Sequence, residues 1–127
     1  MARVLICEPH ADISALLELV IRRLGHEPVL YAGSEWADES IDVAVIEPGV
    51  EDGLRLAHCL RARRIPVLFT SIYPPEPDVL DLAPAAYLVK PFPLAALERA
   101  LGEVLATLDD EHRAIDRSPA VGGSARG

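Results

Sequence analysis

Four side chains that could do chemistry each follow a short apolar run in this chain. The runs end at Glu8, Glu47, Thr70 and Lys90, which offer two carboxylates, a hydroxyl and an ammonium group. If the runs are neighbouring parallel strands, their carboxyl ends lie at one edge of a sheet and bring these groups together. The set could then be an active site, an inactive one, or a switch held in one position.

The elements that must position these residues are predicted by periodicity. Apolar runs of strand length alternate with stretches of helical period, which is typical of βαβ units on a parallel sheet. The predicted fold is α/β, an open doubly wound five-stranded parallel sheet of flavodoxin-like order 2-1-3-4-5, with helices on both faces. We predict strands at 3–7, 27–31, 42–46, 65–69 and 86–89, and helices at 12–24, from 34, at 53–64, briefly within 78–83, and at 93–108.

In a sheet of this order, ligands bind where the strand order reverses, between the first and third strands. Glu8 and Glu47 would therefore face each other, with Thr70 and Lys90 completing one side of the pocket. Lys90 has few other partners than these carboxylates, because it lies between Val89 and a proline at a strand end.

Two segments resemble the receiver domain of two-component response regulators. Residues 86–92 are similar to the lysine–proline segment of that family, with Tyr87 at the aromatic switch position, and residues 65–71 resemble the strand that ends in the switch hydroxyl, here Thr70. In the family, acidic residues after the first strand and an aspartate after the third bind Mg²⁺, and that aspartate accepts a phosphoryl group from a histidine kinase. The resemblance covers about residues 3–108 and implies that Lys90 and Thr70 hold phosphoryl oxygens.

The sequence departs from the family at three points. Glu8 matches the first acidic position, but Pro9 at the second offers no side-chain oxygen. Glu47 replaces the acceptor aspartate, and the loop from it to Gly53 is shortened. We therefore expect Mg²⁺ binding to be lost, with no cofactor in its place, and Glu47 to be a fixed charge that partners Lys90 without phosphorylation.

These departures favour a single-domain, receiver-like signalling protein that is not an enzyme. It would act by protein–protein interaction through residues 71–84, Tyr87 and the last helix, with a homodimer through the same face as an alternative. A divergent response regulator that still accepts phosphate from a histidine kinase is the second hypothesis. A flavodoxin-like small-molecule binder is less favoured, because residues 8–12 contain no glycine and carry acidic charge.

Composition excludes several other functions. The chain has 127 residues and a net charge of -8, with a pI near 4.9, which argues against binding nucleic acid or an anionic membrane surface. No apolar run is long enough to span a bilayer and the N-terminus does not resemble a signal peptide, so a cytoplasmic location is expected.

Residues 1–108 are expected to form the one domain, and residues 109–127 a flexible tail. Cys7 and Cys59 are interpreted as small buried thiols in a reducing compartment. His10 is interpreted as a solvated loop histidine, in preference to a metal ligand or phosphoacceptor.

Overall fold

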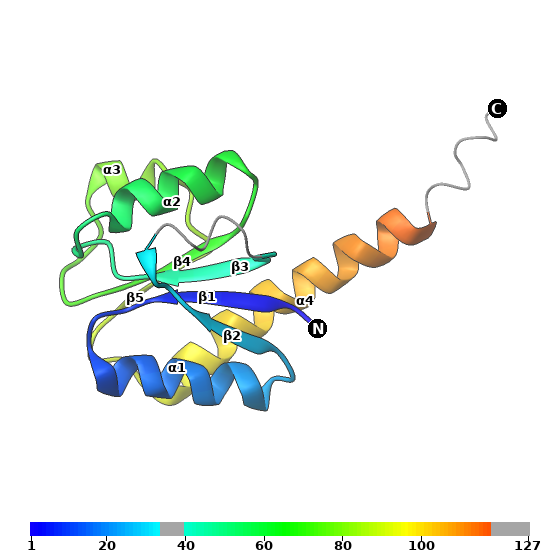
Figure 1. Ribbon diagram of the computed structural model, residues 1–127, viewed down its shortest axis with the longest axis horizontal. Coiled ribbons are helices and arrows are strands. Elements are labelled where there is room, and N and C mark those ends of the chain that lie inside the picture. The colour runs from blue at the N-terminus through cyan, green and yellow to red at the C-terminus, as the bar shows by residue number, and fades with distance from the viewer. Residues whose placement is uncertain (34–39, 118–127) are drawn as a thin grey trace.

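The fold is a parallel sheet of five strands in the order β2-β1-β3-β4-β5 (Figure 1). The computed structural model describes residues 1–33 and 40–117, and the side chains of these up to Glu111. The predicted fold class and strand order are confirmed. The strands are β1 (Arg3–Cys7), β2 (Glu27–Leu30), β3 (Val43–Ile46), β4 (Val67–Ser71) and β5 (Ala86–Val89).

Helices cover both faces of this sheet (Figure 1). Helices α1 (Ala11–Arg23) and α4 (Leu94–Arg117) pack on one face, and α2 (Gly53–Ala62) and the short α3 (Pro77–Leu80) pack on the other. The prediction of at most a turn or two between 78 and 83 is confirmed, since α3 has four residues. Prolines around it limit how far a helix can extend.

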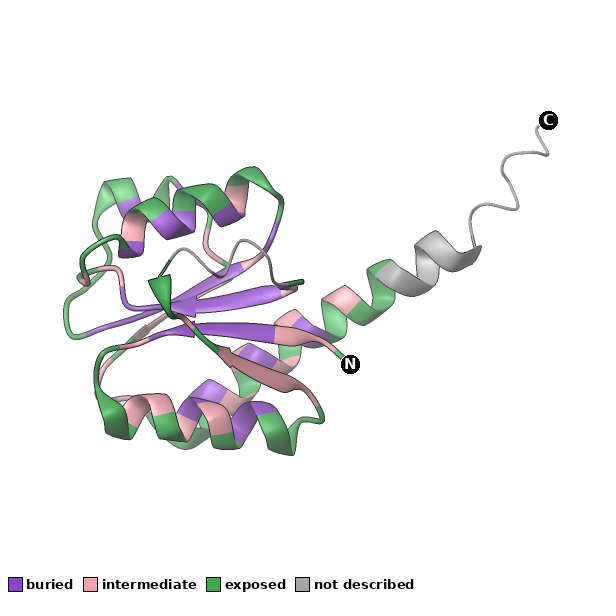
Figure 2. Cartoon of the chain, viewed as in Figure 1, coloured by how far each residue is buried: buried purple, intermediate pink, exposed green. Residues whose placement is uncertain are grey.

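The central strands are buried on both sides, as Figure 2 shows. Every residue of β3 and β4 is buried, so their sequences are almost continuously apolar and do not alternate. Successive side chains still point to opposite faces. Those facing α2 and α3 include Leu5, Ala44, Ile46 and Phe69, and those facing α1 and α4 include Val4, Ile6, Val43, Val45 and Leu68.

The last helix is longer than predicted. Its apolar stripe ends near Leu108, where we placed the helix end, yet α4 continues to Arg117. Residues 109–117 contain neither glycine nor proline, and Pro119 is the first residue that opposes a helix. The predicted tail therefore begins with helix, and its remainder from residue 118 lies outside the described residues.

The prediction that both cysteines are buried is wrong for Cys59, which is exposed, and correct for Cys7. The inward stripe of α2 runs through Leu56 and Leu60. Cys59 precedes Leu60 by one residue, which turns its side chain about 100° away from that stripe.

Two further expectations concern the helix predicted after β2 and helices that could span a membrane. The helix predicted from Ser34, with Trp36, lies outside the described residues. Across residues 1–33 and 40–117, none of the helices has the length and apolar character that crossing a membrane requires.

Candidate functional site

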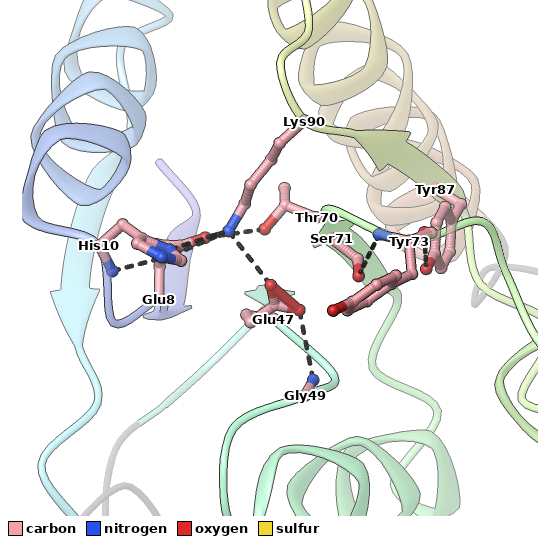
Figure 3. Close-up of polar contacts among 9 residues, drawn as sticks. All are labelled: Glu8, His10, Glu47, Gly49, Thr70, Ser71, Tyr73, Tyr87 and Lys90. Carbon is pink, nitrogen blue, oxygen red and sulfur yellow. Dashed lines mark hydrogen bonds and ion pairs between the residues drawn. The ribbon is translucent and has the colours of Figure 1, made fainter.

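Lys90 lies between two carboxylates at the carboxyl ends of the central strands (Figure 3). It directly follows β5, while Glu8 follows β1 and Glu47 follows β3. The Lys90 ammonium nitrogen Nζ is 2.8 Å from Glu8 Oε1 and 3.0 Å from Glu8 Oε2. It is also 3.2 Å from Glu47 Oε2. One ammonium group therefore contacts three carboxylate oxygens.

Backbone hydrogen bonds hold two of these three residues, Glu47 and Lys90, at the strand ends. The N–H of Glu47 donates to the carbonyl of Cys7 over 2.9 Å, and the N–H of Lys90 donates to the carbonyl of Ser71 over 2.7 Å. Each bond extends the hydrogen bonding between neighbouring strands by one residue. The positions of the charged groups are thus a direct consequence of strand order.

Glu8 is the most heavily bonded member of the cluster. Its Oε1 accepts a hydrogen bond of 3.0 Å from the Thr70 hydroxyl. Its Oε2 accepts a bond of 3.0 Å from the His10 backbone N–H and lies 2.9 Å from His10 Nδ1. That same ring nitrogen is 3.3 Å from Lys90 Nζ.

Glu47 is held by a tight turn on its other side. Its Oε1 accepts a 3.2 Å hydrogen bond from the N–H of Gly49. The turn closes at Gly53, where a Cβ atom would stand only 2.7 Å from the Glu47 carbonyl oxygen and 3.0 Å from Val50. Glycine is required there because the backbone of Gly53 packs directly against that of Glu47.

The pKa of Glu8 is lowered although its side chain is buried. Burial by itself raises this pKa, but hydrogen bonds from Lys90, from the His10 backbone and ring, and from Thr70 outweigh it and lower it below its ordinary value of 4.5. The side chains of Glu8, Lys90 and Glu47 are 0%, 7% and 9% exposed. The charges thus interact with one another more strongly than exposed charges would.

Stability should therefore depend on the ionisation of Glu8. Because the folded-state pKa lies below 4.5, the charged form contributes stability that is present above that pH and is lost as the pH falls through the folded-state pKa. We expect Glu8→Gln to be less stable than wild type at about pH 6, and the difference to shrink steadily on acidification. Urea unfolding of both proteins across this range measures it. A difference that stays constant into strong acid would contradict the assignment.

Cys7, the residue before Glu8, is not an activated thiol. Burial first, and then the negative charges of Glu8, Asp52 and Glu47, raise its pKa from 9.0 to about 11. A thiol with this pKa stays protonated near neutral pH and is a poor nucleophile.

Tyr87 belongs to a separate hydrogen-bonded group beside the cluster (Figure 3). Its hydroxyl donates to the carbonyl of Tyr73 over 2.8 Å, and the Tyr73 N–H donates to the Ser71 hydroxyl over 3.2 Å. The Tyr87 ring is half-buried and packs against Phe69, with ring centroids 6.2 Å apart. Tyr87 thereby anchors the start of the proline-rich loop that follows β4.

This fold is similar to those of several solved response regulators. One from Thermotoga maritima superposes with a TM-score of 0.70 at 16% identity, over 84% of this chain and 98% of that chain. A receiver protein from Burkholderia phymatum gives 0.71 at 20% identity, over 84% and 96%. An orphan response regulator of H. pylori gives 0.68 at 18% identity, over 82% and 96%.

The chain has the receiver-domain fold. The likeness is one of structure, because no family model and no curated protein sequence matches this chain. At these identities the neighbours establish the receiver fold, and what the pocket does must be argued from its own residues.

The receiver fold implies a Mg²⁺ site, and with Lys90 in its observed position the groups in this pocket do not fit one. Mg²⁺ requires near-octahedral oxygen coordination. Pro9 supplies no side-chain oxygen, and Lys90 already contacts both Glu8 and Glu47. Within the part of the chain that the structure describes, no three His, Cys, Asp or Glu side chains are grouped so that they could hold a metal ion.

The structure brings together four of the residues singled out from the sequence: Glu8, Glu47, Thr70 and Lys90. Within this group, the Thr70 hydroxyl donates its hydrogen bond to Glu8. Tyr87 lies in its own group, and Pro9 is exposed in the loop after β1.

Two contributors were missed, His10 and Gly49. His10 contacts Glu8 and Lys90, so its interpretation as simply solvated is incomplete, although its side chain is 59% exposed. Each of the two follows a carboxylate by two residues, and in each case the carboxylate accepts the backbone N–H of that residue. A carboxylate two residues before the N–H that it accepts is typical of side-chain-to-backbone turns. This spacing could have identified His10 and Gly49 from the sequence.

Proposed function

We propose that this chain is a receiver-like signalling module that acts through contacts with other proteins and does not depend on phosphorylation. The observation that supports it is the 3.2 Å contact between Lys90 Nζ and Glu47 Oε2. By the resemblance, Lys90 is the lysine that holds phosphoryl oxygens in receivers. Here a carboxylate of the chain itself engages that lysine, so Glu47 stands as a fixed negative charge in place of a phosphorylated aspartate.

The environment of Glu47 also makes it a poor phosphoryl acceptor. Its Oε1 accepts the Gly49 N–H and its Oε2 contacts Lys90, so both oxygens are already engaged. An incoming phosphoryl group is strongly negative and would meet two carboxylates balanced by a single ammonium group. Without a further cation, charge repulsion opposes the transfer.

One observation favours the rival function, a divergent response regulator that accepts phosphate. A cleft of about 230 Å³ opens beside Glu47, lined also by His10, Ser71 and Tyr73. This cleft is large enough for a small phosphodonor to approach the carboxylate. Access alone therefore does not exclude phosphorylation, and an experiment must separate the two functions.

Intact-mass measurement after incubation with acetyl phosphate and Mg²⁺ makes that separation. We expect no added phosphoryl group on the wild-type protein under conditions that phosphorylate an ordinary receiver. Glu47→Gln is the matched control, since it preserves the length of the side chain and removes its charge. A mass gain that wild type shows and Glu47→Gln lacks would overturn the proposal and identify Glu47 as an acceptor.

The proposed partner surface comprises residues 71–84, Tyr87 and α4. It includes apolar side chains that are at least 39% exposed, and prolines that reduce the conformations that binding would have to restrict. Analytical ultracentrifugation identifies the type of partner. A mass of 13.7 kDa would favour a different protein as the partner, and twice that mass would favour a second copy of this chain. The exposed apolar residues on this surface are Ile72, Tyr73, Leu80 and Leu94.

A further inference from the structure

The Lys90 ammonium nitrogen Nζ lies within hydrogen-bond distance of both carboxylates. It lies 2.8 and 3.0 Å from the two oxygens of Glu8 and 3.2 Å from Glu47 Oε2. All three side chains are at least nine-tenths buried. The ammonium group thus bridges the two carboxylates in surroundings that solvent scarcely reaches.

A divalent cation shared by Glu8 and Glu47 cannot bind while the Lys90 ammonium group keeps this position. Mg²⁺ binds carboxylate oxygens at about 2.1 Å, so a metal shared by Glu8 and Glu47 would lie in the space that Nζ now fills. Two positive centres so close together would also repel each other strongly where water is largely excluded.

We propose that the Lys90 ammonium group serves as the built-in cation of this pocket, in the place where the receiver fold implies a divalent metal ion. The inference goes beyond the proposed function, because it concerns which cation balances the carboxylates and not whether phosphate is transferred. It has a direct consequence: Lys90 blocks a latent divalent-cation site formed by Glu8 and Glu47. The hydroxyl of Thr70 and the N–H groups of His10 and Gly49 already orient those two carboxylates.

Removing Lys90 should therefore open the site. In Lys90→Met, the two carboxylates keep their hydrogen bonds and lose their shared cation. Buried carboxylates without a counter-charge are costly, so they either become protonated or take up a cation from solution. At neutral pH, a divalent ion supplies the missing charge.

The test compares thermal unfolding of wild type and Lys90→Met with MgCl₂ and with NaCl of equal ionic strength, without any phosphodonor. We expect MgCl₂ to raise the unfolding midpoint of Lys90→Met by about 4 °C or more above the NaCl sample, and to leave wild type unchanged. Glu8→Gln/Lys90→Met, which lacks one carboxylate, should lose the shift. Lys90→Gln provides a second neutral variant that can still donate hydrogen bonds, and it should gain the shift if Lys90→Met does not fold.

Either of two results would overturn the inference. A Mg²⁺-specific shift in wild type as large as in the variants would show that Lys90 does not occupy the cation position. No shift in the folded Lys90 variants would show that the carboxylates form no cation site. Since the reaction contains no acetyl phosphate, neither result bears on phosphorylation, which the mass measurement decides by itself.

Discussion

Replacing Lys90 with methionine is expected to lower the free energy of unfolding by about 3 to 5 kcal/mol at neutral pH without divalent ions. The substitution keeps most of the side-chain volume and removes only the ammonium group. Glu8 and Glu47, which are 0% and 9% exposed, would then face each other without a counter-charge. Urea unfolding monitored by circular dichroism measures the loss.

Two comparisons separate lost charge pairing from lost packing. Arg55→Met removes a salt bridge to Asp52 on the surface, where the Arg55 side chain is 82% exposed, and it should change stability by no more than about 0.5 kcal/mol. Glu8→Gln/Glu47→Gln/Lys90→Met removes all three charges and should recover much of the loss, because no unpaired charge remains buried. A loss below about 1 kcal/mol for Lys90→Met would show that solvent screens the cluster.

The central features of the site could be predicted because they depend on strand order. Lys90, Glu8 and Glu47 each directly follow a strand of a parallel sheet, and parallel strands place such residues at one edge. The apolar runs of β1 and β3 are continuous, since these two strands are almost wholly buried. Topology alone therefore brought the charged groups within reach of one another.

The features that the sequence did not predict lie in loops and at helix ends. The structure of these segments is set by backbone geometry and not by hydrophobic periodicity. The Glu8 carboxylate accepts the N–H of His10 at the start of α1, and the Glu47 carboxylate accepts the N–H of Gly49 within the short turn that ends at Gly53. The apolar stripe of the last helix stops near Leu108, although no glycine or proline follows Leu108 before Pro119. An apolar pattern reports what a helix packs against, and not where it ends.

The effect of Pro9 and Glu47 on Mg²⁺ binding can be tested by placing aspartate at both positions. We expect Pro9→Asp/Glu47→Asp to bind Mg²⁺ at least about tenfold more tightly than Glu47→Asp alone, as measured by calorimetric titration. Aspartate at 47 is shorter by one methylene, which withdraws the carboxylate from Lys90 and leaves room for a metal ion. Aspartate at 9 supplies the oxygen ligand that proline lacks, and the number of such ligands is decisive for Mg²⁺.

The matched control is Pro9→Ala/Glu47→Asp, which removes the proline without adding a carboxylate and should bind no better than Glu47→Asp. If Glu47→Asp alone binds as tightly as the double variant, Pro9 contributes less than its position suggests. Lys90 remains in all these proteins, whereas the Lys90→Met test removes it. Together the two tests distinguish two explanations for a missing metal site: the pocket lacks ligands, or Lys90 already fills the cation position. Only under the second explanation does removal of Lys90 create a site.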